Sequence, residues 1–215
     1  MVPVPVASRA PPGGRGMDEG CGVVAKVEAA PNEGAPMIAV ISGTNRPGSN
    51  TRKVAALAVE GLEQAGEEVT LLDLTTLPPE LFEATSYAVK PAGFAPFQDA
   101  ILAAGGILTV IPEYNGACPG IMKYFIDMLR FPESLVEMPA AFIGLSAGRW
   151  GALRAVEQLE MVFQYRHAHL FGRRIFIPDI GAALGVDGRF ADDAIEHRFG
   201  ETVRAFADFC RRLGR

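Results

Sequence analysis

Short apolar runs alternate with longer amphipathic segments along most of this chain. The run MIAVIS at residues 37–42 has no polar alternation, which is typical of a strand that is buried on both faces. In the next segment Val54, Ala58 and Leu62 recur at helical spacing, and a second strand-like run, VTLLDL, follows at residues 69–74. This alternation predicts an α/β fold in which helices cover both faces of a parallel sheet.

The same reading extends to the C-terminus. The predicted strands occupy residues 37–42, 69–74, 107–112, 140–145 and 174–178. The predicted helices lie between residues 49 and 66, at 95–104, 119–131 and 151–165, and in a last segment with one apolar face made by Ile195, Phe199, Val203, Phe206, Cys210 and Leu213. Such strand–helix units match a flavodoxin-like three-layer sandwich with a five-stranded sheet of order 2-1-3-4-5. Ligands bind such sheets beyond the carboxyl ends of the strands, where the first and third strands meet.

Two segments do not fit the alternation. Residues 1–36 are rich in proline and glycine and lack periodic apolar positions, so we expect a disordered leader before one flavodoxin-like domain at residues 37–215. A second Pro-rich stretch at residues 77–96 is expected to run over the surface. Three aromatic side chains of that stretch are candidates for shielding a pocket: Phe82, Tyr87 and Phe94.

Composition narrows the class of protein. The formal net charge is -5 and no basic stripe is visible, so we expect no nucleic-acid partner. No stretch approaches the roughly 18 apolar residues of a membrane span, so we expect no membrane association. The cysteines Cys21, Cys118 and Cys210 have no CxxC spacing, which excludes a disulfide scaffold and a thiolate zinc site. We therefore expect a cytoplasmic protein without a metal site.

The first candidate ligand loop, residues 43–51 (GTNRPGSNT), joins the first strand to the start of a helix. Helix N-termini bind anions, and the hydroxyls of Thr44, Ser49 and Thr51 add donors that suit a phosphate dianion. The loop is not a Walker A motif, because Ser49 occupies the position where that motif needs Lys. The alternative interpretation is a polar connection with a capping serine.

The second candidate loop, residues 112–120 (PEYNGACPG), follows the third strand. Its prolines and glycines indicate an unusual backbone with exposed amides. Tyr114 and Asn115 offer an aromatic face and an amide, which suit a planar heterocycle. The alternative is an ordinary turn between a strand and a helix.

The third candidate loop, residues 144–151 (GLSAGRWG), contains the G-x-S-x-G pattern of the α/β-hydrolase nucleophile elbow at Ser146. The histidines that follow are His167, His169 and His197, and the last of these falls within the final helix rather than on a loop. The expected helix also begins several residues after Ser146 instead of at the nucleophile. A Ser146 esterase is therefore kept as an alternative. Together, a phosphate cradle, a turn against a flat ring and a small-residue turn favour an FMN site.

Three sequence segments carry a family resemblance: GTNRPGSNTRKVA, PEYNGACPGIMKYFIDML and SAGRWGALRAVEQL. They resemble the NADPH-dependent FMN reductase family, which includes bacterial azo, quinone and chromate reductases of flavodoxin-like fold. The resemblance extends from about Met37 to Arg212. Two positions depart from the family pattern, because Thr51 stands where Asn is common and Trp150 replaces a small residue.

The resemblance implies FMN-binding residues in all three loops: Thr44, Arg46, Ser49, Asn50 and Thr51 for the phosphate; Pro112, Glu113, Tyr114, Asn115 and Gly116 along the isoalloxazine; and Ser146, Gly148 and Gly151 at its other edge. It also implies that FMN takes a hydride from NADPH or NADH and passes two electrons to a quinone, azo, flavin or similar small-molecule acceptor. No catalytic acid or nucleophile of the protein is then required.

Three arginines are candidates for the 2′-phosphate of NADPH: Arg46, Arg149 and Arg154. A solvated surface charge is the alternative for each of them. Family members form homodimers or homotetramers, and the apolar helix at residues 119–131 is suited to such an interface. The main functional alternative is a flavodoxin-like electron carrier that binds FMN but has no NAD(P)H site.

Overall fold

The computed structural model describes residues 37–214, and the leader predicted at residues 1–36 lies outside them. The strands are β1 (Ile38–Ser42), β2 (Val69–Asp73), β3 (Gly106–Pro112), β4 (Pro139–Leu145), β5 (His169–Leu170) and β6 (Ile175–Ile177). The α-helices are α1 (Asn50–Gln64), α2 (Ala95–Ala103), α3 (Gly120–Met128), α4 (Leu153–Tyr165), α5 (Ile180–Ala183) and α6 (Asp193–Leu213). Short 3₁₀ helices lie at η1 (Leu74–Thr76), η2 (Pro79–Phe82), η3 (Ala84–Tyr87) and η4 (Ala92–Phe94).

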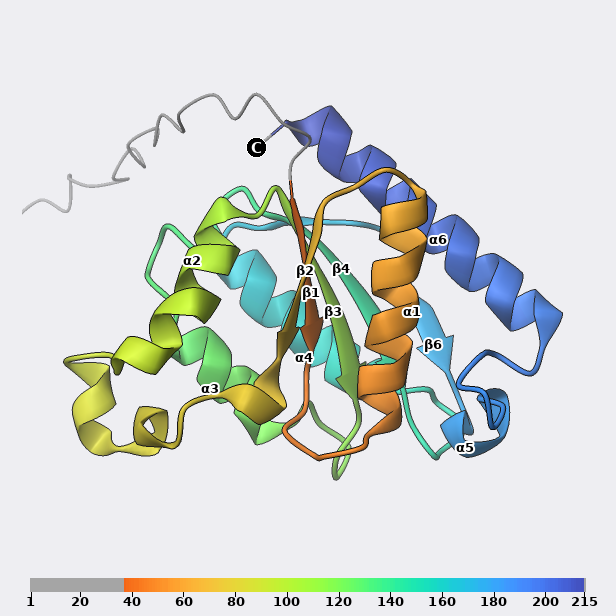
Figure 1. The fold of residues 1–215 in the computed structure, drawn as a ribbon, viewed down its shortest axis with the longest axis horizontal. Helices are drawn as coiled ribbons and strands as arrows, with labels where there is room; N and C mark the ends of the chain where they lie inside the picture. The colour runs from red at the N-terminus through yellow and green to blue at the C-terminus, as the bar shows by residue number, and fades with distance from the viewer. Residues whose placement is uncertain (1–36, 215) are drawn as a thin grey trace, which may run out of the picture. The chain divides into compact units, whose positions relative to one another are not determined.

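The strands form one parallel sheet of order β2-β1-β3-β4-β5, with β6 also beside β4, so the predicted order is confirmed (Figure 1). The sequence predicts a single fifth strand, but two short strands share that position. Pro139 of β4 faces His169, whereas Leu145 faces Ile177. Four residues separate β5 from β6, but only two residues of β4 lie between the positions that pair with these two strands. The extra residues interrupt the pairing and divide the strand.

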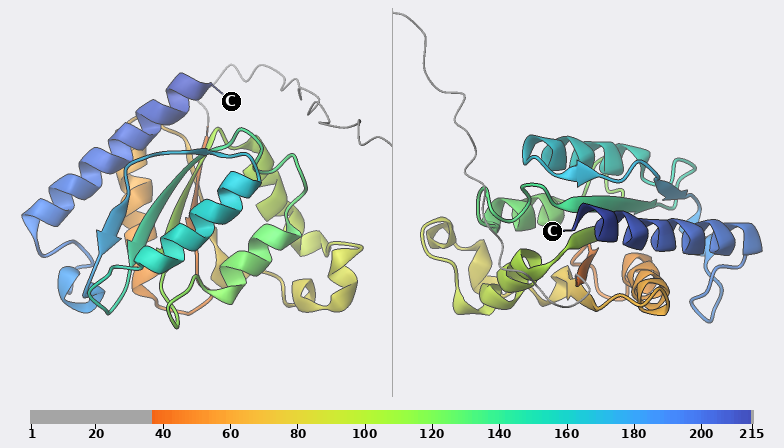
Figure 2. Two further views of the ribbon diagram at one scale, coloured as in Figure 1. Left: turned by 180° about the vertical axis from the view of Figure 1, so that it is seen from behind. Right: turned by 90° about the horizontal axis from the view of Figure 1, so that it is seen from above.

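Helices cover both faces of the sheet, and each face has its own apolar core. All residues of β1, β3 and β4 are buried, which explains their unbroken apolar sequences. Buried side chains of α2, α3 and α4 pack on one face, and those of α1 and α6 pack on the other. The two views in Figure 2 show the sheet between these helix layers.

The helix ends follow local chemistry. The Ser49 side chain caps α1 by accepting the N–H of Arg52, as the sequence predicts. The helix predicted at residues 119–131 is shorter, because α3 ends at Met128. The N–H of Arg130 donates to Oε1 of Gln98 at 2.8 Å instead of to a helical carbonyl. Pro132 follows shortly afterwards, and the residue before a proline rarely adopts the helical conformation.

The stretch at residues 77–96 is more ordered than predicted. Leu81 and Phe94 are buried in the core, and the Phe94 ring packs against Phe97 and Phe125. The prediction that Phe94 shields a pocket is therefore wrong, since the ring is 1% exposed. One residue of the last helix also differs from expectation, because Leu213 is 41% exposed.

Phe82 and Tyr87, from the same stretch, remain at the surface and pack against Tyr124 of α3. Their aromatic contacts join this stretch to the outer side of α3. Within residues 37–214, no helix has the length and apolarity that crossing a membrane requires.

Candidate functional site

Three loops meet at the carboxyl edge of the sheet, which is the lower edge in Figure 1. We call them loop 1 (residues 43–49), loop 2 (residues 113–119) and loop 3 (residues 146–152); they follow β1, β3 and β4. The chain leaves β1 toward β2 on one side, whereas β3 lies on the other side of β1. The strand order therefore reverses at β1. Parallel sheets of this kind bind ligands at such a switch point.

Loop 1 starts in close contact with β3. The N–H of Gly43 donates to the carbonyl of Val110 at 2.9 Å. A Cβ at Gly43 would lie 2.6 Å from Cδ1 of Ile111, so a larger side chain here would push the loop away from β3. Glycine thus lets the backbone turn directly from β1 into the site.

The start of α1 presents hydrogen-bond donors. Ser49 Oγ accepts the N–H of Arg52 at 3.2 Å, which leaves the Ser49 hydroxyl proton for another acceptor. The N–H groups of Asn50 and Thr51 belong to the first helical turn, where no helical carbonyl can pair with them. Together with the positive end of the helix dipole, these donors make an anion-binding site.

An ion pair that the sequence prediction missed fixes the start of α1. Nε of Arg52 lies 2.9 Å from Oδ2 of Asp73, at the carboxyl end of β2. Oδ1 of Asp73 also accepts the N–H of Thr75 at 3.0 Å. The only sequence signal for this pair is that Asp73 ends a strand adjacent to the strand that leads into α1.

Loop 2 contains a tight turn at Tyr114–Ala117. The two end residues exchange backbone hydrogen bonds of 2.9 and 3.1 Å. Asn115 and Gly116 have φ values of 52° and 75°, as a type I′ turn requires, and the Asn-Gly pair is the sequence preferred there. The turn exposes Asn115 at its tip, next to the half-buried Tyr114.

Glu113 brings a partly buried carboxylate to loop 2. Its Oε2 is buried without a hydrogen-bond partner among residues 37–214. Its Oε1 lies 3.9 Å from Nη1 of Arg154, which is 64% exposed on α4. A buried acceptor without a partner lowers the stability of the fold unless a bound molecule supplies a donor. Glu113 therefore indicates a ligand with N–H or O–H groups.

The remaining contacts join loop 2 to α4. The N–H of Cys118 donates to Oε1 of Gln158 at 2.9 Å. Partial burial raises the pKa of the Cys118 thiol, so it remains protonated near neutral pH. These properties agree with a small packing residue.

A hydrogen bond joins loops 1 and 2. Oγ1 of Thr44 and Oη of Tyr114 lie 2.8 Å apart, and the N–H of Arg46 donates to the same Thr44 oxygen at 3.2 Å. The sequence prediction places Thr44 beside a phosphate and Tyr114 beside a ring. The structure brings the two side chains into direct contact.

Loop 3 is held by its own hydrogen bonds. Oγ of Ser146 donates to the carbonyl of Gly148 at 2.9 Å, and the N–H of Ser146 donates to the carbonyl of Ile177 at 3.1 Å. Gly151 has a φ of 57°, and a Cβ there would lie 2.7 Å from the nitrogen of Ile177. Loop 3 is therefore a glycine-dependent turn packed against β6.

This geometry does not support an esterase. The Ser146 hydroxyl is committed to its own loop, and α4 begins only at Leu153. His169 faces Pro139 at the amino end of β4, whereas Ser146 follows the carboxyl end of that strand. His197 lies on the exposed side of α6 and contacts Glu201 at 3.6 Å.

The predicted site residues all lie on these three loops or the adjoining ends of β3 and α1. The buried ones are Thr44, Thr51, Pro112 and Gly151. The partly buried ones are Ser49, Asn50, Glu113, Tyr114, Gly116 and Ser146. The exposed ones are Arg46, Asn115 and Gly148.

The donor set fits a phosphorylated flavin. Loop 1 and the start of α1 supply hydroxyl and amide donors for a phosphate, and Arg46 supplies a cation beside them. Loop 2 supplies an aromatic ring, an amide and an unpaired carboxylate oxygen for a flat heterocycle with polar edges. Fold and site together define a flavodoxin-like protein of the flavoprotein class.

The chain belongs to the NADPH-dependent FMN reductase family, whose sequence profile matches residues 36–181. It is 31% identical over 180 residues to an NAD(P)H-dependent FMN reductase of Pseudomonas aeruginosa, covering 80% of this chain and 94% of the relative. It is also 31% identical over 158 residues to a quinone reductase of Pseudomonas putida, covering 67% of this chain and 82% of the relative.

Among solved structures, the flavoenzyme NAD(P)H:(acceptor) oxidoreductase from Paracoccus denitrificans superposes with a TM-score of 0.72 at 26% identity. The match covers 84% of this chain and all of that chain. The predicted family and enzyme class, an oxidoreductase, are confirmed. The expected cofactors, FMN with a pyridine nucleotide as co-substrate, agree with the description of the family.

Proposed function

We propose that this protein binds FMN across loops 1, 2 and 3, oxidises NAD(P)H and passes two electrons to a quinone or similar small acceptor. The observation that carries the proposal is the junction of loops 1 and 2 at the switch point, where the Thr44–Tyr114 hydrogen bond joins loop 2 to the loop that leads into α1. The quinone reductase relative supports the acceptor class. The odd number of cysteines, without CxxC spacing, favours a reducing compartment such as the cytoplasm.

The residues have separate tasks in this proposal. Ser49, the free amides of Asn50 and Thr51, and the guanidinium of Arg46 bind the phosphate. The turn at residues 114–117 places its exposed amides along the ring, while the Tyr114 side chain reaches loop 1. Bound FMN supplies the redox chemistry, since its ring accepts a hydride and releases two electrons. The protein therefore contributes orientation rather than acid–base groups.

Two exposed arginines near the part of the site assigned to the flavin ring are available to bind the pyridine nucleotide. Arg149 lies in loop 3 and Arg154 in the first turn of α4, and both side chains are exposed. Guanidinium groups bind phosphate bidentately, so these residues are our candidates for the 2′-phosphate of NADPH. Arg154 lies near Glu113, and that neighbour weakens its attraction for a phosphate.

An FMN-binding electron carrier is the second candidate, because carriers share this fold. Steady-state oxidation of NADPH and NADH, measured with a quinone and with free FMN, separates the two functions. The enzyme turns over with at least one acceptor. A protein that binds FMN but shows no turnover with either nucleotide is a carrier.

Flavin binding tests the site directly. We expect purified protein to show flavin absorption after addition of FMN. Arg46→Ala and Ser49→Ala should each weaken FMN binding by about tenfold, because each removes one donor to a charged group. Arg212→Ala, on the exposed side of the last turn of α6, is the matched control. Unchanged titration curves in both loop 1 variants would refute the phosphate assignment.

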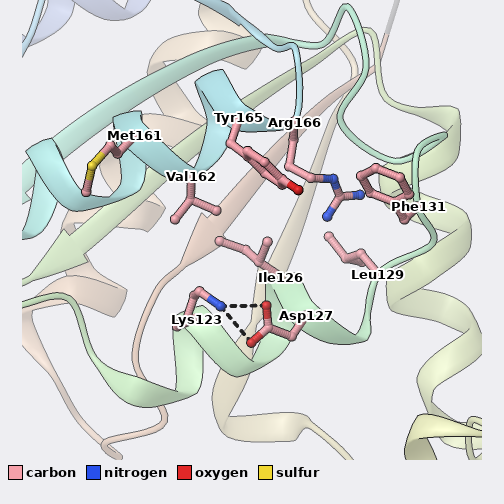
Figure 3. Close-up of a pocket in the computed structure, with 9 residues that line it drawn as sticks. All are labelled: Lys123, Ile126, Asp127, Leu129, Phe131, Met161, Val162, Tyr165 and Arg166. Atoms are coloured by element: carbon pink, nitrogen blue, oxygen red, sulfur yellow. Dashed lines mark hydrogen bonds and ion pairs between the residues drawn. The ribbon is translucent and has the colours of Figure 1, made fainter. Parts of the chain in front are cut away.

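We further propose that the protein is a homo-oligomer, at least a homodimer. A groove with a volume of about 700 Å³ lies between α3 and α4 (Figure 3). Its lining residues are Lys123, Ile126, Asp127, Leu129, Phe131, Met161, Val162, Tyr165 and Arg166. The most exposed apolar side chains of the groove are Phe131, Met161 and Tyr165, which are 66%, 65% and 76% exposed.

A second copy of the chain suits this groove. Large apolar side chains stand beside the hollow, so a two-fold arrangement can place the projections of one copy in the groove of the other. Charged groups of the groove have partners within the chain, apart from Nε of Arg166, which is buried without a hydrogen-bond partner among the described residues. Lys123 pairs with Asp127, and Nη2 of Arg166 donates to the carbonyl of Arg130 at 2.8 Å. A second copy that covers the groove can therefore leave the Lys123–Asp127 pair and the Nη2 contact of Arg166 in place.

A further inference from the structure

The Thr44–Tyr114 pair has hydrogen-bonding capacity that the chain does not use. Thr44 is 0% exposed, and its hydroxyl oxygen accepts the N–H of Arg46 at 3.2 Å. Tyr114 is partly buried and belongs to the turn of loop 2. The two hydroxyl oxygens lie 2.8 Å apart, so they share one hydrogen bond.

The number of hydroxyl protons in the Thr44–Tyr114 pair exceeds the number that its hydrogen bond uses. Each hydroxyl supplies one proton and two lone pairs. The shared bond consumes one proton, whichever group donates, and Arg46 consumes a lone pair of Thr44. One hydroxyl proton of the pair is therefore left without an acceptor among the described residues.

Burial decides which group holds that proton. If Tyr114 were the donor, the unused proton would belong to Thr44, which no solvent reaches. If Thr44 donates to Tyr114, the unused proton belongs to the partly buried phenol, where a ligand oxygen can accept it. The second arrangement avoids a buried unpaired donor, whose cost is comparable to that of a lost hydrogen bond.

We propose that Tyr114 donates this proton to the phosphate of FMN and so makes the site selective for FMN over riboflavin; this inference rests on the proposed flavin site. The phenol oxygen is bonded to loop 1, the anion-binding side of the site, although Tyr114 itself belongs to loop 2. Thr44 is then a positioning residue, because it holds the phenol oxygen while Arg46 holds Thr44. The selectivity comes from a group that riboflavin lacks.

The test compares two flavins in the same variants. We expect Tyr114→Phe to weaken FMN binding by about tenfold or more while riboflavin binding changes by less than about twofold. The dissociation constants are measured by quenching of flavin fluorescence in titrations of the whole protein. The control is Thr202→Val, which deletes a hydroxyl that donates to the carbonyl of Arg198 within α6 and should leave both constants unchanged.

Two variants of the partner test the positioning role. Thr44→Val removes the hydroxyl that holds Tyr114 and should selectively weaken FMN binding. Thr44→Ser keeps the hydroxyl and should restore most of the FMN affinity. Thermal unfolding of each variant without flavin shows whether the fold is intact, so that a folding defect is not read as a binding defect.

The outcomes are distinct. Equal weakening of FMN and riboflavin by Tyr114→Phe would overturn the phosphate role and assign Tyr114 to the ring. No weakening of either flavin would also overturn it, while wild-type binding of FMN would keep the proposed function. A wild-type protein that binds neither flavin would overturn the proposed site and this assignment together.

Discussion

Cys210 shows how a single residue can be closed to chemistry by its surroundings. Its side chain is completely buried in the core between α6 and the sheet. Burial is the largest cause that raises the pKa of its thiol to about 12. At neutral pH the group is therefore a protonated packing residue, as the apolar face of the last helix predicts.

The neighbour of Cys210 on β3 gives a prediction at this scale. A Cβ at Gly106 would overlap with Sγ of Cys210, so we expect Gly106→Ala to lower the free energy of unfolding by about 1–3 kcal/mol. In the double variant with Cys210→Ala, the added methyl occupies the space that the sulfur leaves. Urea unfolding should thus show that the double variant is more stable than the sum of the single effects implies. Strict additivity would contradict this packing account.

Among individual residues, the sequence predicts which residues belong to the site better than it predicts which side chains contact each other there. The hydroxyls and glycines of loop 1, and the Asn-Gly turn of loop 2, are local features that sequence spacing reveals. The Thr44–Tyr114 and Arg52–Asp73 contacts depend on how strands align in the sheet. Such long-range pairs cannot be read from spacing along one chain.

At the scale of elements, the unbroken apolar runs were enough to predict β1, β3 and β4. The two-residue strand β5 has too few positions for any periodicity, so the sequence gives no sign of it. The early end of α3 depends on the side chain of Gln98, which comes from another helix. Tertiary contacts of this kind override local helix preference.

An ion pair fixes α6 to the turn between α1 and β2. Arg211, in the last turn of α6, contacts Oε1 of Glu67, whose side chain is only 1% exposed. The same guanidinium also contacts Asp208 on its own helix. Oε2 of Glu67 is buried without a partner within the described part of the chain, so this carboxylate depends on Arg211.

We therefore expect Arg211→Ala to lower the free energy of unfolding by about 1–3 kcal/mol, because it leaves a buried carboxylate without its cation. Chemical denaturation monitored by circular dichroism measures the change. Arg212→Ala is the control, since the adjacent arginine is exposed and should alter stability by less than about 0.5 kcal/mol. Equal effects of the two substitutions would show that the Glu67 contact contributes little.

At the scale of the whole molecule, the groove between α3 and α4 predicts the oligomeric state. We expect Met161→Glu to shift the protein toward monomer, because it introduces a charge into an apolar contact surface. Light scattering coupled to size-exclusion chromatography measures the mass directly. Val186→Glu is the matched control, since Val186 is fully exposed and does not line the groove. A wild-type monomer at all concentrations, or an unchanged mass in Met161→Glu, would contradict this interface.

The outer strand position of the sheet is divided between β5 and β6, and this division affects how another chain could pair with the edge of the sheet. A long, straight outer strand presents a row of unpaired N–H and C=O groups that can zip onto another chain. Here one outer position is split into strands of two and three residues, and the opposite outer strand, β2, has five residues before the chain bends into a 3₁₀ turn. The border made by β5 and β6 therefore presents no unbroken row of backbone groups, which is one way in which natural sheets limit edge-to-edge pairing.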